Sequence, residues 1–209
     1  MLFFDLDGTL VDSNWVWVQV DTEFLDRRGL EVTEAYTEFV SHSIFPVAAQ
    51  FTKDYYKLPE STQEIMEEWM TAAQEAYTCH IPVKPHARAY LEQCQRKGHE
   101  MALLTASVPD LCRACIDRHG LTPFFSRLIF AQELGLEKRD PRTFAAAAQL
   151  VGAAPEDCTV FDDGPANCVS ARAAGMRAVG VYDPFFAAAE QEMRLTCDQY
   201  IRSFAELLE

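Results

Sequence analysis

Two aspartates near the start of the chain, Asp5 and Asp7, are the residues whose spacing most directly suggests chemistry. They follow the apolar segment 2–4, and side chains alternate between the faces of a strand, so we expect both carboxylates on one side of its carboxyl end. Gly8 permits a sharp turn directly after them. Two carboxylates this close repel each other unless a cation or a proton lies between them. The segment therefore predicts a reactive site and, with it, an enzyme.

A second group of polar residues follows a later apolar segment. Thr105 ends that segment, and Ser107 and Asp110 have the spacing that caps a following helix. Hydroxyl and backbone N–H groups would then gather at the start of the helix, where anions bind readily. The segment predicts a cradle for a phosphate group.

A lysine and a second acidic pair follow two further apolar segments. Lys138 precedes a helix expected to begin near Pro141 and would supply a fixed positive charge. Asp162 and Asp163 precede a helix expected to begin at Pro165. Carboxylates provide the hard oxygen ligands that a magnesium ion prefers, and a lysine with hydroxyl groups can bind phosphoryl oxygens. Together these residues predict phosphoryl transfer.

The elements that must position these residues have the pattern of a parallel sheet wrapped by helices. Short, almost wholly apolar segments alternate with amphipathic helical ones, as in sheets whose strands are buried on both faces. The expected strands lie at residues 2–4, 101–104, 128–130, 159–161 and 178–181. Whether the chain adds another strand after Tyr182 is left open. Sites in open α/β sheets gather at the carboxyl ends of the strands, so the polar groups should converge there.

Residues 14–83 break this alternation and show at least three helical patterns instead. In the clearest of them, Ser61 and Glu64 are spaced as a capping box. Its apolar residues form one broad stripe: Ile65, Met66, Trp69, Met70, Ala73 and Tyr77. We predict an α/β, Rossmann-like core domain formed by residues 1–13 and 84–209, with an inserted all-helical cap domain at residues 14–83.

The acidic composition of the chain restricts the classes of partner that we expect. The 209 residues include 32 acidic and 18 basic side chains, for a formal net charge of -14, and 49% are hydrophobic, enough for a globular core. There is no Lys/Arg cluster suited to a row of phosphates, and no apolar run of the length of a membrane span. We expect a cytoplasmic protein with neither nucleic acid nor membrane as a partner, and composition predicts no oligomeric state.

The seven cysteines are an odd number, which a disulfide framework does not favour. Cys112 and Cys115 form a Cys-x-x-Cys pair in an expected helix, but no second pair or histidine completes a zinc set. We predict free thiols, with a redox or metal role for the pair as the alternative.

In this order and with these gaps, the residues resemble the four motifs of the haloacid dehalogenase superfamily of phosphatases. The motifs are Asp5-Leu6-Asp7-Gly8-Thr9, Thr105, Lys138 and Asp162-Asp163. The helical insert resembles that of the β-phosphoglucomutase-like branch, and the resemblance covers essentially the whole chain. One departure is Arg139, because the third motif more usually has proline after its lysine.

The resemblance implies a covalent mechanism. Asp5 would be the nucleophile and would form an aspartyl-phosphate. Asp7 would protonate the leaving alcohol and then deprotonate the water that hydrolyses this intermediate. Thr105 and Lys138 would bind the oxygens of the transferred phosphoryl group.

The same resemblance implies Mg²⁺ as the cofactor. The ligands would be a carboxylate oxygen of Asp5, the backbone carbonyl of Asp7 and the side chain of Asp163, with Asp162 acting directly or through water.

Substrate choice would depend on the cap, which in this branch closes over the site. The cap has twelve acidic and four basic side chains, so we expect a small phosphorylated metabolite with one phosphate. His42, Ser43 and Lys53 lie where a specificity loop is expected. Trp15 and Trp17 would line the leaving-group pocket or, equally, pack inside the cap.

Four alternatives to a phosphatase remain. A sugar-phosphate mutase is the strongest, although Trp17 stands about where the mutases of this branch carry a histidine. Dehalogenases of the superfamily lack the equivalent of Asp7, and phosphonate hydrolases use a lid lysine, for which Lys53 or Lys57 would have to serve. The fourth is a non-catalytic protein that binds a cation or a partner in the acidic cleft.

Overall fold

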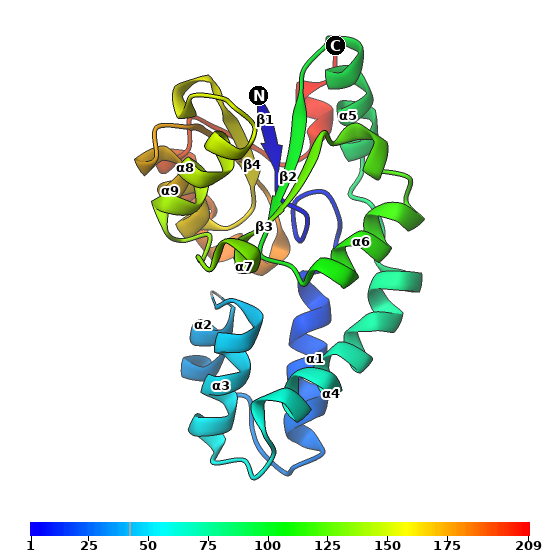
Figure 1. Ribbon diagram of the computed structural model, residues 1–209, viewed down its shortest axis with the longest axis vertical. Coiled ribbons are helices and arrows are strands. Elements are labelled where there is room, and N and C mark those ends of the chain that lie inside the picture. The colour runs from blue at the N-terminus through cyan, green and yellow to red at the C-terminus, as the bar shows by residue number, and fades with distance from the viewer. Residues whose placement is uncertain (42) are drawn as a thin grey trace.

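The computed structural model describes residues 1–41 and 43–209 and contains a six-stranded parallel sheet with helices on both faces (Figure 1). The strands are β1 (Leu2–Phe4), β2 (Met101–Thr105), β3 (Arg127–Phe130), β4 (Thr159–Asp162), β5 (Arg177–Val181) and β6 (Gln199–Ile201). The helices are α1 (Asn14–Asp26), α2 (Glu34–Val40), α3 (Phe45–Tyr56), α4 (Thr62–Glu75), α5 (Ala87–Arg96), α6 (Pro109–Arg118), α7 (Ala131–Leu134), α8 (Pro141–Leu150), α9 (Pro165–Ala173) and α10 (Glu190–Thr196). The predicted α/β fold is confirmed.

All five predicted strands are present, and each end lies within one residue of its predicted position. The spatial order is β3-β2-β1-β4-β5-β6, so β1 is a central strand between β2 and β4. The sixth strand answers the question that the sequence leaves open, since β6 pairs in parallel with β5 and Tyr182 donates its backbone N–H to Ile201. Its three residues are only partly apolar, which is why no buried-strand pattern marks it.

The sheet is buried on both faces because successive side chains of each strand point to opposite sides. In β1, Phe4 packs on the side covered by α5 and α6, whereas Phe3 packs on the side covered by α8. Both phenylalanines are fully buried. This layering leaves the carboxyl edge of the sheet as the place where polar residues can gather.

Helices α1 to α4 form a separate group beyond the carboxyl edge of the sheet, below it in Figure 1. The predicted capping box at the start of α4 is confirmed: Ser61 accepts from the backbone N–H of Glu64, and Glu64 accepts from that of Ser61. A π-helical turn, Ala76–His80, follows α4 directly. The assignment of residues 14–83 to a domain of their own stays a prediction.

The chain enters and leaves this helical group through two adjacent segments. Val11 and Val83 form an antiparallel bridge, Asp12 donates its N–H to Pro82, and Lys84 donates its N–H to Leu10. The helical group is therefore joined to the sheet by a paired connection.

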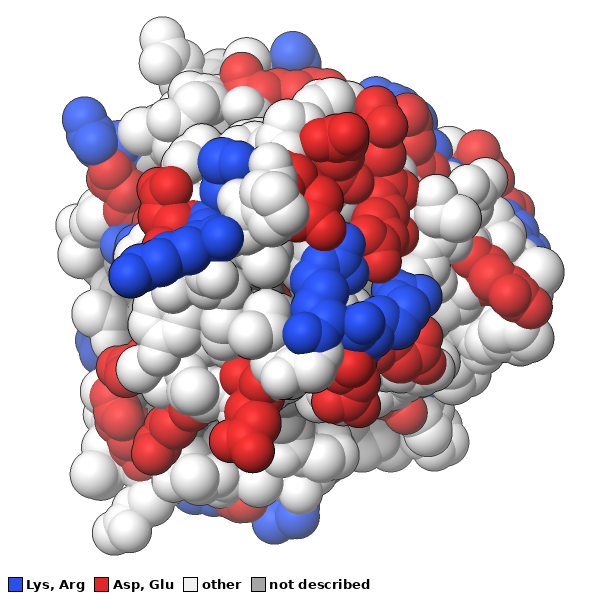
Figure 2. Space-filling view, turned by 90° about the horizontal axis from the view of Figure 1, so that it is seen from below, with Lys and Arg blue, Asp and Glu red and all other residues white. Residues whose placement is uncertain are grey.

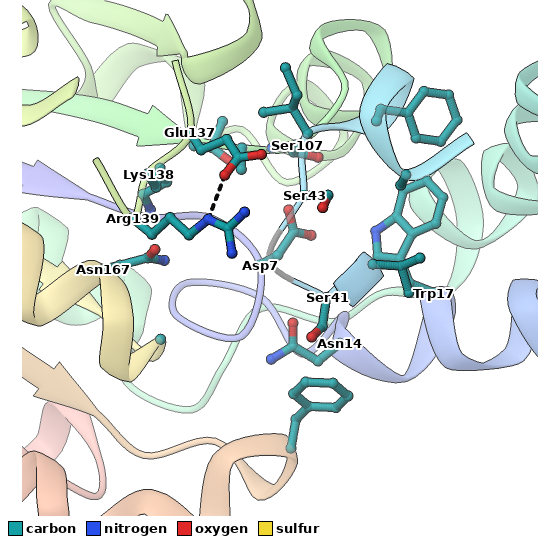
Figure 3. A pocket seen from close by; sticks show the side chains of 18 of the residues that line it. Asp7, Asn14, Trp17, Ser41, Ser43, Ser107, Glu137, Lys138, Arg139 and Asn167 are labelled. Carbon is teal, nitrogen blue, oxygen red and sulfur yellow. Dashed lines mark hydrogen bonds and ion pairs between the residues drawn. The ribbon is translucent and has the colours of Figure 1, made fainter. Parts of the chain in front are cut away.

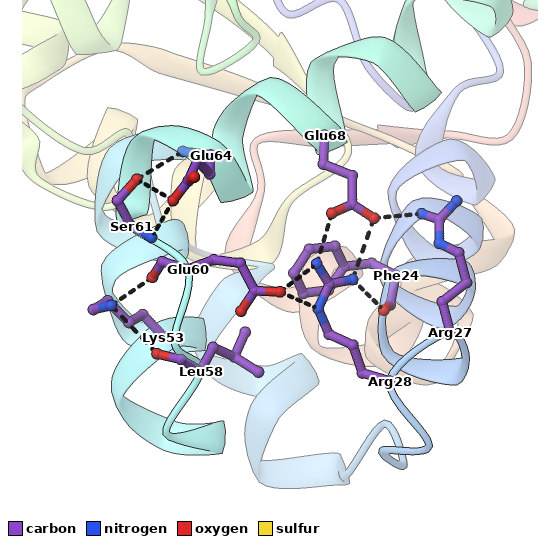
Figure 4. Close-up of polar contacts among 9 residues, drawn as sticks. All are labelled: Phe24, Arg27, Arg28, Lys53, Leu58, Glu60, Ser61, Glu64 and Glu68. Atoms are coloured by element: carbon purple, nitrogen blue, oxygen red, sulfur yellow. Dashed lines mark hydrogen bonds and ion pairs between the residues drawn. The ribbon is translucent and has the colours of Figure 1, made fainter.

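The far end of the helical group is held by ion pairs rather than by apolar packing alone. Arg28 binds both Glu60 and Glu68, and its guanidinium lies 3.7 Å from the centre of the Phe24 ring (Figure 4). Seen from below, the surface has several separate groups of acidic side chains with basic ones between them (Figure 2). In the described part of the chain, no helix is both long and apolar enough to cross a membrane.

Candidate active site

The four predicted motifs meet at the carboxyl edge of the sheet. Asp5 directly follows β1, Thr105 ends β2, and Asp162 ends β4. Lys138 arrives from the loop between α7 and α8 and forms ion pairs with two of these aspartates. The convergence expected from strand order is therefore present.

Three carboxylates form the acidic centre of the site. Asp5, Asp162 and Asp163 are buried, and each offers an oxygen atom within 4.8 Å of the others. Burial raises the pKa of Asp5 to about 7 against the opposing effect of Lys138, and it raises that of Asp163 well above its usual range, with Asp162 adding to both. Such a set is stabilised by a divalent cation with hard oxygen ligands, so Mg²⁺ fits these residues.

Lys138 is buried between two of the carboxylates. Its Nζ lies 2.8 Å from Oδ1 of Asp5 and 2.5 Å from Oδ2 of Asp162. Although burial alone lowers the pKa of Lys138, Asp162 and Asp5 raise it above its ordinary value, so the side chain stays an ammonium. The other oxygen of Asp162 accepts from the backbone N–H of Gly164 and from Asn167. Asp162 is thus better placed to hold Lys138 than to bind a metal directly.

Asp163 is held by residues that the sequence did not indicate. Thr9 donates to its Oδ1 at 3.1 Å, and Asn14, the first residue of α1, donates to its Oδ2 at 2.8 Å. Asn14 also donates to Asp183 at 3.0 Å, and Asp183 forms an ion pair with Lys84 at 2.7 Å. The side-chain amide of Asn14 therefore links Asp163 of the acidic centre to Asp183. Asp183 in turn binds Lys84, at the paired connection of the helical group.

Gly8 is required at its position for two reasons. Its φ is +70°, a left-handed conformation that favours glycine. A Cβ atom there would lie 2.0 Å from Oδ2 of Asp163 and 2.2 Å from Nδ2 of Asn14. The absence of a side chain is what lets this loop approach Asp163.

Asp7 has its own hydrogen-bond partners. Ser13 and Tyr77 each donate a hydroxyl to its Oδ1 at 2.6 Å, and Trp17 donates its indole N–H to the Tyr77 hydroxyl at 3.1 Å. Burial, followed by the charge of Asp7, raises the pKa of Tyr77 well above its usual range, so the hydroxyl stays a donor. Tyr77 lies in the π-helical turn 76–80, and such turns often occur at functional sites.

The segment predicted to cradle a phosphate group is built differently from the prediction. Thr105 is fully buried, and its hydroxyl accepts from the backbone N–H of Ser107. The prediction that Ser107 and Asp110 cap the next helix is wrong: α6 is preceded by Val108, with no side-chain cap. Pro109 occupies the first turn, where its fixed φ starts a helix without a capping side chain.

A cavity of about 240 Å³ lies between the sheet edge and the helices. Its sheet side includes Asp5, Asp7, Thr105, Lys138 and Asp163. Its helical side is mainly apolar and includes Trp17, Val18, Val40, Ile44, Phe45 and Ala48. Asp7 points into the cavity opposite Trp17 (Figure 3). The proposed reacting groups therefore share one space with an apolar wall.

The predicted specificity residues of the cap lie in different places. Trp17 and Ser43 line the cavity, whereas His42 lies outside the described residues. Trp15 is 42% exposed and is not among the described lining residues, so it fits neither of its two expected places, the pocket wall or the inside of the cap. Lys53 donates to two carbonyl oxygens at the far end of the helical group, which removes the basis for a phosphonate hydrolase with this lysine (Figure 4).

Arg139, the departure from the usual third motif, also lines the cavity. It forms an ion pair with Glu137 at 2.5 Å (Figure 3). Its backbone carbonyl accepts from Ser170 at 2.6 Å, and this contact fixes the loop without a proline. The position of Lys138 is therefore preserved.

The cysteines are free thiols, as predicted. Cys112 and Cys115 are buried in α6, and burial raises the pKa of Cys115 to about 11. A protonated, buried thiol is a poor nucleophile and a poor metal ligand, which speaks against the redox and metal alternative.

Comparisons with known proteins agree with this geometry. A model of the haloacid dehalogenase-like hydrolase family matches residues 1–175. The phosphoserine phosphatase of Thermus thermophilus is 38% identical over 154 residues, which span 73% of this chain but only 59% of that protein. Hexitol phosphatase A of Escherichia coli is 29% identical over 185 residues, spanning 87% of this chain and 82% of that protein. Among solved structures, β-phosphoglucomutase from Clostridium difficile has the same fold, with a TM-score of 0.81 at 16% identity over 99% of this chain and 92% of that one.

Proposed function

The chain belongs to the haloacid dehalogenase-like hydrolases and is an enzyme of the phosphatase type; we propose that it is a magnesium-dependent phosphatase of the β-phosphoglucomutase-like branch, with Asp5 as the nucleophile. The observation that carries this proposal is the ion pair of Asp5 with buried Lys138 in the cavity that Asp7 also lines. A carboxylate, a cation and a proton donor at one cavity are what phosphoryl transfer through an aspartyl-phosphate requires.

In the first step, a carboxylate oxygen of Asp5 attacks the phosphorus atom, and the bond between phosphorus and the ester oxygen breaks. Asp7, in its protonated form, gives its proton to the leaving oxygen, so that a neutral alcohol departs. Lys138 and the Thr105 hydroxyl, which accepts from Ser107 and keeps its own hydrogen to donate, bind the phosphoryl oxygens while charge is redistributed. Ser13 and Tyr77 hold one oxygen of Asp7, and this fixes the direction of the other.

In the second step, Asp7 takes a proton from a water molecule, which attacks the phosphorus atom of the aspartyl-phosphate. The bond between phosphorus and Asp5 breaks, and inorganic phosphate leaves with the Asp5 carboxylate restored. Mg²⁺ bound by Asp5, Asp163 and the Asp7 carbonyl would supply positive charge that offsets repulsion between these carboxylates and the phosphate. Thr9 and Asn14 orient Asp163 for that role.

We infer that the substrate is a small molecule with one phosphate. The relatives are named as phosphatases of phosphoserine and of hexitol phosphates, and the cavity of about 240 Å³ suits a molecule of that size. Its apolar helical wall would exclude water from the reacting groups.

The test is release of inorganic phosphate from an aryl phosphate, with magnesium and with a chelator, by the wild-type protein and by Asp5→Asn. Asp12→Asn is a matched control, because Asp12 is an exposed aspartate of the same loop and is not among the described lining residues. We expect magnesium-dependent release that survives in the control and is lost in Asp5→Asn. Full activity of a folded Asp5→Asn variant would overturn the covalent mechanism.

A sugar-phosphate mutase is the second outcome of that test. It would be established by an isomeric sugar phosphate that forms without free phosphate. No described contact favours it, because Trp17 points its indole N–H at Tyr77, and an indole cannot shuttle a proton as a histidine can.

A further inference from the structure

The helical wall of the cavity has one charged residue among its described members, Asp21 of α1. Its neighbours in the wall are mostly apolar, with Trp17 and Val18 preceding it on the same helix. An ionised carboxylate in such surroundings is costly unless a cation or hydrogen-bond donors accompany it. The Asp21 carboxylate therefore needs a cation or hydrogen-bond donors beside it.

Among the described residues, one side chain donates a hydrogen bond to the Asp21 carboxylate. The hydroxyl of Tyr36 donates to Oδ1 at 2.9 Å, and none of the described residues gives Oδ2 a hydrogen bond or pairs Asp21 with a cation. Burial raises the pKa of Asp21 to about 6, which still leaves the carboxylate mainly ionised at neutral pH. Oδ2 is thus free to accept from a molecule in the cavity.

The positive charges around the cavity are already paired. In the described lining, Lys138 binds Asp5 and Asp162, and Arg139 binds Glu137. Away from the transferring phosphoryl group, the cavity therefore presents a negative charge and no unpaired cation among these residues. Such a wall disfavours a second phosphate or a carboxylate on the substrate and favours a cation.

We propose that Asp21 binds a primary ammonium group of the substrate, so that the substrate class is an amino-substituted alkyl phosphate. This inference rests on the proposed phosphatase function, because the phosphate end of the molecule must lie at Asp5. The ammonium would donate to Oδ2 while Tyr36 keeps Oδ1.

The first experiment measures kcat/KM of the wild-type enzyme for four esters of equal chain length. They are 5-aminopentyl, 5-hydroxypentyl, n-hexyl and 5-carboxypentyl phosphate, which end in ammonium, hydroxyl, methyl and carboxylate. A five-carbon chain is used because Asp21 lies seven residues, or about 10 Å of helix, beyond Asn14, which contacts Asp163. A charge-assisted hydrogen bond predicts that the aminopentyl ester exceeds the hexyl ester about 10- to 100-fold, with the hydroxyl ester between them and the carboxylate ester last. Equal values for the ammonium and methyl esters, or a preference for the carboxylate ester, would overturn the proposal.

The second experiment repeats the series with Asp21→Asn. The amide keeps an oxygen for Tyr36 and nearly the same shape, so the substitution removes mainly the charge. We expect the ratio of kcat/KM for the aminopentyl ester to that for the hexyl ester to fall to within about threefold. Asp26→Asn is the matched control, because Asp26 is exposed on the same helix and is not among the described lining residues; its ratio should equal that of the wild type.

Different results would overturn the proposed phosphatase function and the proposed role of Asp21. If the wild-type protein hydrolyses none of these esters and no aryl phosphate, the proposed function itself fails. If it hydrolyses them without preferring the ammonium ester, only the assignment to Asp21 fails. A ratio that stays high in folded Asp21→Asn would likewise overturn the role of this residue.

Discussion

The two walls of the cavity hold their charged groups in different ways. At the sheet edge, Asp163 accepts hydrogen bonds on both oxygens, and Asp162 binds an ammonium, a backbone N–H and an amide. On the helical wall, Asp21 has one described partner, Tyr36. Groups held by several partners need little reorganisation when charge moves during a reaction. The difference supports the proposal that the chemistry occurs at the sheet edge and that Asp21 on the helical wall has hydrogen-bonding capacity left for the substrate.

The basic residues of the sheet edge and of the helical group also differ, because their ion pairs are buried to different extents. Lys138 is buried among carboxylates, whereas Arg27 forms an ion pair with Glu68 near the surface of the helical group (Figure 4). A buried pair is costly to break because a charge is left without a partner, whereas an exposed pair contributes little. Variants of matched residues in the two regions therefore test the comparison.

The largest effect is expected for Lys138→Met. Removing the ammonium leaves Asp5 and Asp162 without their cation, which should lower the free energy of unfolding by about 3–5 kcal/mol. Phosphate release should fall about 100- to 1,000-fold, because the phosphoryl oxygens lose a donor. The measurements are urea unfolding with a chelator present and the aryl phosphate assay. Arg27→Met should change stability by less than about 1 kcal/mol. Equal losses of stability in Lys138→Met and Arg27→Met would contradict the difference between buried and exposed ion pairs.

Two glycines with the same backbone conformation give the next contrast. Gly8 and Gly29 have φ of +70° and +67°, but a Cβ atom at Gly8 would collide with Asp163, whereas a Cβ atom at Gly29 has nothing within 4 Å. Gly29→Ala should cost about 1 kcal/mol from its backbone alone. Gly8→Ala should cost about 2–4 kcal/mol and abolish most activity, since the loop must shift. Thermal unfolding and the aryl phosphate assay measure both, and an active Gly8→Ala enzyme would contradict the described loop geometry.

A smaller effect is expected where the walls meet, at Tyr77. Tyr77→Phe removes one of the two hydrogen bonds to Oδ1 of Asp7 and leaves Ser13 in place. An alkyl leaving group needs protonation more than an aryl one, so kcat/KM should fall about tenfold for an alkyl phosphate and less than threefold for an aryl phosphate.

The control for this variant is Tyr56→Phe. The Tyr56 hydroxyl donates to the Glu31 carbonyl, and Tyr56 is not among the described lining residues. It should leave the ratio of the two esters unchanged. Equal losses on both esters in Tyr77→Phe would show that Tyr77 supports the fold rather than the position of Asp7.

The sheet edge was predictable from sequence because its signals are local. Short apolar segments mark the strands, and each polar residue ends a strand or directly follows it, so parallel pairing brings Asp5, Thr105 and Asp162 together. The loop around Lys138 tolerated an unusual residue, Arg139, because Ser170 binds its carbonyl.

The contacts of the helical wall were not predictable in this way. Tyr77 has the spacing of an apolar stripe, and only the π-helical turn directs its hydroxyl to Asp7. Asn14 reaches Asp163 across 149 positions of sequence, a pairing that no local pattern encodes. Asp21 is one of twelve acidic residues in the insert, and composition does not distinguish the one that lines the cavity from the others.

The smallest effect concerns the pH dependence of stability, and Asp21 again provides the test. Its pKa of about 6 in the folded state exceeds the ordinary value of 3.8, so between these values the folded state holds a proton that the unfolded state has lost. Stability from this group is therefore complete below about pH 4 and is lost as the pH rises through 6. The rise from 3.8 to about 6 corresponds to about 3 kcal/mol, and solvent reaching the partly exposed Asp21 reduces this. Asp21→Asn lacks the loss, so relative to the wild type it should gain about 1–2 kcal/mol between pH 4 and pH 7. Urea unfolding of both proteins at several pH values measures the difference, and Asp26→Asn should show none of it. A flat difference for Asp21→Asn would mean that Asp21 is already accompanied by a cation, and the space for a substrate ammonium would be gone with it.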